Sequence, residues 1–513
     1  MKSALRTVHV RVTDTSTSAP TPVRLRFTDP SGEYLAPMGR LAAFATGQNH
    51  DVGGNLLLGT RSYAYIDGSC EISLPPGRVL VEIHKGPEYK PLCHEVSLGV
   101  GQLALRYSLK RWIDPRQERW YSGDIRSHFL TPHGALLEGA AEDIAVVNLL
   151  AVEHRRHTKA AGEHPSIPNM LAFSGQRPAL EAPERMVVVN TLNVHPALGS
   201  LGLLNCHRTV FPLSFGGPDG LDNWTLADWC DQCHRKRGLV VWTRAFPLED
   251  ESRLGEPLAD LILGKIDALE ITNFDDSPCG VLSDWYRLLN CGLFVPLVGG
   301  SGKDSNQIAL GSMRTYARLQ PGEDFTYANW IDAVRAGRTI VTSGPLLSFS
   351  VNGEDPGARV DLKTAGETVR IRAEARSLEP FDCLQILANG EVIASAEPSG
   401  APFSAMIDAD LPFSESVWLA ARCWGQEQAA AGPHRRLLAH SSPVSIRVQQ
   451  QRPRVDPEAA TMLMDQLDKM LDWSLRKAHC DTDKQRENLA GIFREAKQHL
   501  SMQREARGRT CQP

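Results

Sequence analysis

The sequence predicts a mixed α/β protein in which an alternating strand–helix domain stands between two β-rich domains and a helical hairpin ends the chain. Three observations support this prediction: period-two alternation of apolar residues before about residue 110, alternating strand and helix patterns over 111–345, and renewed period-two alternation over 346–450. With 513 residues, of which 42% are hydrophobic, the chain can bury several cores.

Residues 1–110 are expected to form a β-sandwich. Val8, Val10 and Val12 alternate with polar residues, which is typical of strands with one buried face. Turn-forming clusters such as Pro75-Pro76-Gly77 separate the candidate strands.

The segment 111–345 shows the strand–helix alternation of a layered or barrel α/β domain. Asp222 or Asn223 is expected to cap its second helix, and Gly238 is expected to end that helix. Strands are predicted over 144–152, 186–192, 239–242, 268–272 and 294–298, and helices over 135–142, 225–236, 257–263, 283–290 and from Thr326 to Gly337.

Residues 346–450 are predicted to form a second β-sandwich, in which Asn389-Gly390 marks a tight hairpin. Residues 455–507 are predicted to form a helical hairpin, with Asp456 as N-cap and Pro457 at the first helical position. Packing of this hairpin on the body is the preferred interpretation, and homo-oligomerisation through the same helices is the alternative.

Composition excludes several classes of protein. The net charge of −5, without a large basic block before the C-terminal tail, argues against nucleic-acid binding. No apolar run of membrane-spanning length is present, and the N-terminus lacks the apolar region of a signal peptide, so a cytoplasmic location is expected. The eleven cysteines are odd in number and scattered, which favours free buried thiols.

A dense polar cluster follows a predicted strand at Trp120–His133. Asp124, His128 and His133 lie within ten residues, and such clusters at strand ends are where α/β barrels keep their chemistry. Carboxylate and imidazole groups could hold Zn²⁺, Mn²⁺ or Fe. Arg126 cannot, because its guanidinium remains protonated. The alternative is a set of polar side chains that stabilise a loop.

Several longer strings resemble the polymerase-and-histidinol-phosphatase (PHP) superfamily, specifically its CehA/McbA-like metallohydrolase branch, over about residues 110–355. The matching strings are Trp120–His128, Ala141–Asn148, Gly264–Glu270, Trp285–Gly292 and Ala333–Leu346. The resemblance implies a distorted (β/α)7 barrel with a di- or trinuclear metal site. It also implies hydrolysis of ester, amide, carbamate or phosphoester bonds by metal-activated water.

This chain departs from the family pattern at its expected metal ligands. Family histidines correspond to Arg126, Ser200 and Arg244, whereas His128 carries over and Glu270 matches a family position. Each arginine places a fixed positive charge where a metal ligand is expected, and guanidinium pairs well with carboxylate, phosphate or sulfate.

Two functional hypotheses follow, both with a small molecule or glycan as the expected ligand. In the first, His128, His133, Asp124 and Glu270 hold a reduced divalent-metal site for hydrolysis, with the two substituting arginines beside it. In the second, the barrel is inactive and binds an anionic group through Arg126 and Arg244. The glycine loop Gly299–Ser305 could present Ser301, Lys303 and Asp304 to either ligand. The arginines could instead form structural salt bridges with Asp124, Glu270 or Asp304.

Three other motifs are interpreted as structural. Cys230-Asp-Gln-Cys233-His234 matches a haem-attachment pattern but lies in a predicted amphipathic helix, so no haem is expected. The Gly-Lys of the glycine loop lacks the spacing of a phosphate-binding Walker loop, so no nucleotide cofactor is expected. His195 and His207 are interpreted as hydrogen-bonded core or rim residues rather than ligands.

Overall fold

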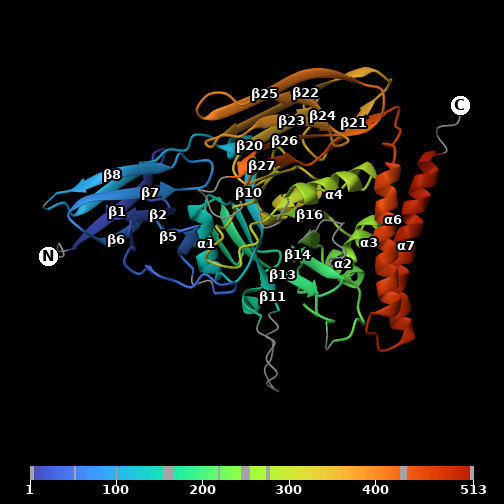
Figure 1. Cartoon of the computed structure of the whole chain (residues 1–513), viewed down its shortest axis with the longest axis horizontal. Helices are drawn as coiled ribbons and strands as arrows, with labels where there is room; N and C mark the ends of the chain where they lie inside the picture. The colour runs from blue at the N-terminus through green and yellow to red at the C-terminus, as the bar shows by residue number, and fades with distance from the viewer. Residues whose placement is uncertain are drawn as a thin grey trace.

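The computed structural model describes residues 5–50, 53–99, 101–153, 167–217, 220–243, 255–272, 278–427 and 436–508. The predicted mixed α/β composition is confirmed, with several sheets and helices gathered mainly in the central and C-terminal parts. Figure 1 shows the N-terminal strands at the left, a β-rich C-terminal layer at the top and two long helices at the right. No helix of this described part is long and apolar enough to cross a membrane.

The N-terminal part consists of two sheets that share one apolar core. The alternating Val8, Val10 and Val12 all point into this core, as their spacing predicts. One sheet has the order β6-β1-β9 and the other the order β4-β5-β2-β7-β8, with β3 beside β2. The strands are β1 (Arg6–Asp14), β2 (Val23–Thr28), β3 (Tyr34–Leu35), β4 (Asn55–Leu58), β5 (Arg61–Ile66), β6 (Ser69–Leu74), β7 (Gly77–His84), β8 (Leu92–Leu98) and β9 (Ala104–Leu109).

Seven strands of the central part lie in the order β10-β11-β13-β14-β15-β16-β17. All neighbouring pairs are parallel except those of β14, which runs antiparallel to both β13 and β15. The strands are β10 (Trp120–Ser127), β11 (Val146–Val152), β13 (Arg185–His195), β14 (Gly199–Leu204), β15 (Leu239–Thr243), β16 (Ala268–Ile271) and β17 (Leu297–Gly299), and a short β12 (Leu180–Ala182) pairs with β13.

Helices pack on both sides of these strands. One face of these strands shares a core with α5. The other face of β14–β17 shares a core with α2, α3 and α4. The helices are α1 (Pro132–Ala141), α2 (Leu226–Arg235), α3 (Pro257–Ile262), α4 (Pro278–Asn290) and α5 (Tyr327–Arg335), with short 3-10 turns at Pro115–Glu118 and Met170–Ala172.

The last of the seven strands comes back beside the first. The backbone N–H of Gly302 donates to Arg126 O at 2.9 Å and that of His128 to Lys303 O at 2.8 Å, so an isolated parallel bridge joins Ser127 to Lys303. Within the described residues no longer ladder closes this edge. Side-chain hydroxyl groups instead accept hydrogen bonds from the backbone N–H groups of β17. Thr315 Oγ1 accepts from Gly299 N at 2.7 Å, and Ser442 Oγ accepts from Leu297 N at 3.0 Å.

The sheet that contains these strands continues without a break into the C-terminal part. Antiparallel pairing runs from β10 through β18 and β19 to β27, and then to β26, β23 and β24. A separate sheet of order β20-β22-β25 packs on this extension. The strands are β18 (Arg314–Arg318), β19 (Thr339–Thr342), β20 (Leu346–Val351), β21 (Arg359–Leu362), β22 (Glu367–Ser377), β23 (Cys383–Ala388), β24 (Glu391–Ala396), β25 (Phe403–Phe413), β26 (Val417–Glu427), β27 (Arg436–Ser441) and β28 (Val444–Val448).

The predicted hairpin at Asn389-Gly390 is present. It joins β23 to β24, and its two residues have φ of 50° and 92°. Positive φ at both central residues is the requirement of a type I′ turn, which Asn-Gly meets at little cost.

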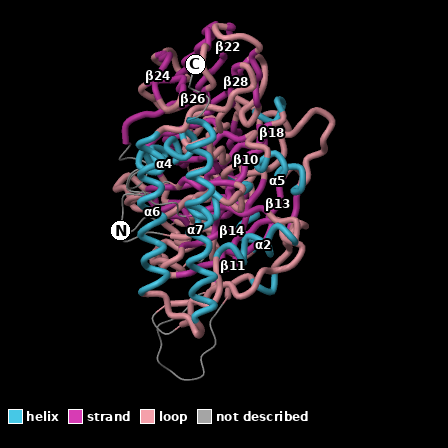
Figure 2. Tube along the Cα trace, turned by 90° about the vertical axis from the view of Figure 1, so that its right-hand side faces the viewer, coloured by secondary structure: helices cyan, strands magenta, loops and turns pink. Residues whose placement is uncertain are grey.

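The C-terminal helical hairpin packs on the body, as predicted. Helices α6 (Pro457–Arg476) and α7 (Asp483–Gly508) lie side by side in Figure 2 and bury Leu463, Leu467 and Phe493 in the core shared with α2, α3 and α4. Asp456 caps α6, since its carboxylate accepts from Glu458 N and Ala459 N. The apolar face that could have served self-association is therefore used within the chain.

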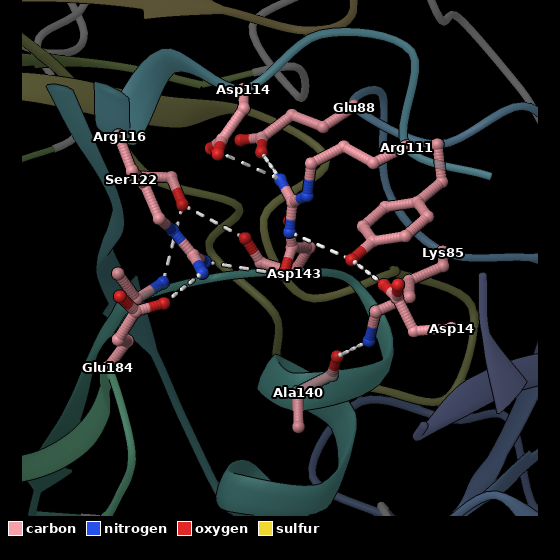
Figure 3. Close-up of polar contacts among 12 residues, drawn as sticks. Asp14, Lys85, Glu88, Arg111, Asp114, Arg116, Ser122, Ala140, Asp143 and Glu184 are labelled. Carbon is pink, nitrogen blue, oxygen red and sulfur yellow. Dashed lines mark hydrogen bonds and ion pairs between the residues drawn. The ribbon is translucent and has the colours of Figure 1, made fainter. Parts of the chain in front are cut away.

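A buried charge network joins the N-terminal sheets to the central part (Figure 3). Its centre is Asp143, which pairs with Arg111 at 2.7 Å, Arg185 at 2.8 Å and Arg116 at 3.2 Å. Arg111 also pairs with Glu88. Burial opposes ionisation of Asp143, but the surrounding cations outweigh it and hold the pKa of this carboxyl well below its usual range.

Lys85 extends the same interface to helix α1. Its ammonium donates to Ala140 O at 2.6 Å and to Pro22 O at 2.8 Å, so it caps the C-terminal end of α1 from the N-terminal part. Burial lowers the pKa of Lys85 to about 7, although Asp143 acts in the opposite direction. Helix α1, which follows the polar cluster directly, is thus fixed at its far end.

The ends of helix α2 correct two sequence predictions. Its N-cap is Thr225 in a capping box with Asp228, and not Asp222 or Asn223. At its C-terminal end Arg237 adopts the left-handed conformation, with φ of 60°, in place of Gly238. Gly238 serves a different purpose, because a Cβ there would lie 2.4 Å from both Cys206 Sγ and Cys233 Sγ.

Replacing Gly238 with alanine is therefore expected to destabilise the protein by about 1–3 kcal/mol, since the added methyl group overpacks a buried site. Gly491→Ala is the matched control. Gly491 lies within α7, and a Cβ there would meet no atom within 4 Å. Alanine is expected to stabilise that helix by about 0.5–1 kcal/mol. Thermal unfolding of both variants measures the two effects, and equal melting temperatures would contradict the close packing at Gly238.

Candidate functional site

The polar cluster predicted at Trp120–His133 lies where the end of β10 meets the loop after β17. Asp124 is fully buried, and its two carboxylate oxygens accept four hydrogen bonds from the protein. Oδ1 accepts from Arg126 N at 3.1 Å and Ser301 N at 2.9 Å, while Oδ2 accepts from Ser301 Oγ at 2.5 Å and Gly311 N at 2.8 Å. Burial raises the pKa of Asp124 to about 6, although these hydrogen bonds act in the opposite direction. The carboxylate therefore fixes the loop to β10.

Arg126 forms a buried ion pair with Glu270 at the end of β16. Arg126 Nε lies 2.8 Å from Glu270 Oε1 and 2.9 Å from Oε2, and their side chains are 6% and 0% exposed. The glycine loop packs directly against this pair. A Cβ at Gly300 would lie 2.5 Å from Glu270 Oε1, and one at Gly302 would lie 2.9 Å from Arg126 Nη2. Glycine is required there because the backbone approaches the charged groups so closely.

His128 is buried beside the ion pair. Its Nε2 lies 3.4 Å from Arg126 Nη1 and its Nδ1 lies 3.3 Å from Leu150 O. Because the guanidinium only donates and the carbonyl only accepts, this pair of contacts fits the tautomer with hydrogen on Nδ1. A register shift between Asp124 and Ser127 accompanies the turn of the strand toward His128.

The glycine-loop residues expected to bind ligand are held by protein groups. Ser301 donates to Asp124, as described above. Lys303 is fully buried, donates to Ser305 O and Ile308 O at 3.1 Å and 3.0 Å, and lies 3.4 Å from Glu138 Oε2 of α1. Asp304 accepts from Gln48 Nε2 at 2.8 Å and thereby contacts the N-terminal part. The loop is thus fixed on two sides.

The four residues expected to ligate a metal do not converge. His133 is exposed in the first turn of α1, Glu270 is paired with Arg126, and the oxygens of Asp124 face protein donors. Among the described residues, no three His, Cys, Asp or Glu side chains are placed to hold a metal ion. These donors do not fit the metal site implied by the family resemblance.

Ser200 and Arg244 are the two other positions at which this chain departs from the family's histidines. Ser200 lies at the start of β14, and its Oγ is 3.1 Å from Thr243 Oγ1 at the end of β15. Arg244 lies outside the described residues.

Comparison with known proteins adds no assignment. Neither a family model, nor a curated protein, nor a solved structure matches this chain.

The side chains of the Cys230–His234 motif have protein neighbours. Cys230 and Cys233 are buried in α2, and His234 Nε2 lies 2.9 Å from Asp267 Oδ2. The nine cysteines whose side chains the structure describes are free thiols.

His195 anchors the C-terminal hairpin. Its Nε2 lies 2.8 Å from Asp222 Oδ1, and its Nδ1 accepts from Leu198 N at 2.8 Å. The other oxygen of Asp222 accepts from His479 N at 2.7 Å, in the turn between α6 and α7. This long-range partnership explains why Asp222 does not cap α2.

Sequence reasoning missed two groups of residues. Glu138, the partner of Lys303, lies on the buried face of α1 and could have been found as a carboxylate at an apolar helix position. The second group lines a groove at the opposite end of β10, where Glu118 and Trp120 meet Arg318 and Arg372. No sequence signal connects these residues, because they come from distant segments.

Proposed function

We propose that the central part is a PHP-type barrel of the CehA/McbA-like branch that has lost its metal site and serves in binding rather than hydrolysis. The seven-strand order, with the bridge from Ser127 to Lys303 linking its ends, supports a distorted (β/α)7 barrel. The reversed β14 accounts for the distortion.

The observation that carries the proposal is the Arg126–Glu270 pair. In the family, this region is expected to hold metal-bound water, but here a guanidinium and a carboxylate neutralise each other in a buried site. Introducing a divalent cation beside Arg126 would place like charges together in a poorly solvated region, which is strongly unfavourable. Asp124 and Lys303 are likewise satisfied within the protein.

One specific observation favours a ligand at this place. Glu270 engages only Nε of Arg126, and Nη2 has no hydrogen-bond partner among the described residues. Unused guanidinium donors suit a carboxylate or phosphoester group, and the sequence supplies Arg244 as the second cation of this hypothesis. Because Glu270 cancels the charge of Arg126, this second candidate function depends on Arg244 for net attraction.

Metal content distinguishes binding from hydrolysis. Purified protein is expected to contain no stoichiometric Zn, Mn or Fe and to cleave neither p-nitrophenyl acetate nor p-nitrophenyl phosphate when these metals are added. Stoichiometric metal together with metal-dependent cleavage would instead establish the hydrolase with a reduced site. In contrast, the combined variant Arg126→His, Ser200→His, Arg244→His is expected to gain Zn²⁺ binding, because it restores three family ligands. Arg208→His, at an exposed position, is the matched control and is expected to gain none.

A further inference from the structure

Two buried thiols from different elements meet beside the C-terminal end of helix α2. Cys206 lies two residues after β14, and Cys233 lies in the last turn of α2. Their Sγ atoms are 3.3 Å apart, and the two residues are 1% and 0% exposed. They are 27 positions apart in the sequence, so tertiary packing, and not the geometry of one element, brings them together.

The backbone around both cysteines is held by hydrogen bonds. Asn205 Nδ2 donates to Arg237 O at 3.1 Å, and His207 N donates to Lys236 O at 3.3 Å. The residues on either side of Cys206 are thereby bound to the segment that ends α2. The contact between the two sulfurs is therefore fixed by the surrounding chain as well as by the thiols themselves.

Gly238 leaves space for both sulfurs. A Cβ at this position would lie 2.4 Å from Cys206 Sγ and 2.4 Å from Cys233 Sγ. A disulfide has its sulfurs about 2.05 Å apart, so the two must approach each other by about 1.3 Å. Each Sγ is carried on a rotatable Cα–Cβ bond, and small rotations of both side chains bring the sulfurs toward each other.

A third cysteine of the same helix has a different neighbour. Cys230 lies one turn before Cys233 and is also fully buried. Its Sγ lies 4.0 Å from Asp260 Oδ2. Cys230 therefore offers a matched reference, because it shares the helix and the burial of Cys233 but contacts a carboxylate.

We propose that Cys206 and Cys233 form a reversible disulfide when the protein meets hydrogen peroxide. The Cys206 thiolate attacks one peroxide oxygen, the O–O bond breaks, and the departing hydroxide takes up the thiol proton as water, which leaves a sulfenic acid. The Cys233 sulfur then attacks the Cys206 sulfur, the S–O bond breaks, and the hydroxyl leaves with the Cys233 proton as a second water. Two thiols are oxidised, and one hydrogen peroxide is reduced to two waters.

The order of the two steps follows from the surroundings of Cys233. Burial raises the pKa of its thiol, and the hydrogen bond with Cys206 acts in the same direction. Because the thiolate is the nucleophile, the first attack is assigned to Cys206. Cys206 lies directly beneath the surface, since the next residue, His207, is exposed.

The cross-link would close a loop that helps to hold the C-terminal hairpin. This loop contains Asp222, whose carboxylate accepts from His479 N in the turn between α6 and α7. A bond between the two ends of the loop restricts the unfolded chain more than the folded one. The oxidised protein is therefore expected to unfold at a higher urea concentration than the reduced protein. This site is independent of the function proposed for the barrel.

Peptide mapping tests the proposal. The folded protein is treated with excess hydrogen peroxide, remaining thiols are blocked with N-ethylmaleimide before unfolding, and the product is digested with trypsin without reductant. The expected result is a cross-link between the tryptic peptides 186–208 and 209–235. The linked pair should be about 2 Da lighter than the two reduced peptides together, because two hydrogens are removed. Dithiothreitol should separate the peptides again.

Substitutions then identify the partner, because peptide 209–235 contains both Cys230 and Cys233. Cys206→Ala and Cys233→Ala are each expected to abolish the cross-link. Cys230→Ala is the matched control and is expected to retain it. The map of the wild-type protein needs no variant, so the test does not depend on how well a variant folds.

Three outcomes would overturn the proposal. The first is that the wild-type protein forms no cross-link, even where Cys206 becomes oxidised to an acid. The second is a cross-link that persists in Cys233→Ala or is lost in Cys230→Ala, which would make Cys230 the partner. The third is a cross-link that dithiothreitol does not remove.

Discussion

Replacing Glu270 with glutamine is expected to lower the free energy of unfolding by about 3–5 kcal/mol. The change preserves shape but leaves Arg126 charged and buried without its paired carboxylate. Loss of one partner of a buried ion pair is costly because the remaining charge has already lost its hydration. Urea unfolding followed by tryptophan fluorescence measures the effect.

Two comparisons make this test specific. Glu374→Gln removes the same charge from an exposed pair with Arg376, and there the loss is expected to be at most about 1 kcal/mol. The double variant Arg126→Met, Glu270→Met removes both charges, and most of the lost stability is expected to return. A loss below about 1 kcal/mol in Glu270→Gln would show that the pair is not buried as described.

Replacing Asp143 with asparagine is expected to lower the free energy of unfolding by at least as much as Glu270→Gln, about 3–5 kcal/mol at pH 7. Three arginines then remain close together without the carboxylate that separates their charges. Because Arg111 belongs to the linker from the N-terminal sheets, the docking of those sheets should loosen as well. Urea unfolding gives the stability, and faster tryptic cleavage near Arg111 reports the loosened interface.

The difference in stability between the wild-type protein and Asp143→Asn should depend on pH with a defined sign. The pKa of Asp143 is held well below its usual value of about 3.9, so the folded state favours the ionised form. Its contribution to stability is complete above about pH 4 and is lost as the pH falls further. The wild-type protein and Asp143→Asn should therefore converge in stability at strongly acidic pH. Asp332→Asn, in an exposed pair with Arg335, is the control and should differ little at any pH. A pH-independent difference at Asp143 would contradict the network.

The sequence predicts local structure better than it predicts contacts between residues that are distant in the chain. Period-two and helical patterns place most strands and helices, and Asn389-Gly390 and Asp456 specify their turn and cap through their own backbone chemistry. The prediction that Asp222 caps α2 is wrong because residues distant in the sequence, His195 and His479, bind its carboxylate. Local propensity cannot weigh such contacts.

The same limit applies to the candidate site. The substitution at Arg126 identifies a fixed cation among expected metal ligands, and Glu270 is one of the carboxylates with which it could pair. The direction of Lys303 toward Glu138, however, depends on how α1 packs against the glycine loop. The groove near Trp120 depends on five separate segments meeting, which no motif encodes.

The uninterrupted sheet makes the central part depend on strands from the end of the chain. Strand β27 pairs with β19, so the edge of the central part is covered by a strand that lies about a hundred residues later in the sequence. A truncated chain without β27 has a bare β19 edge, and bare strand edges recruit other chains into aggregates. The C-terminal β-layer is therefore needed to cover the β19 edge, and a chain that ends near residue 345 should aggregate.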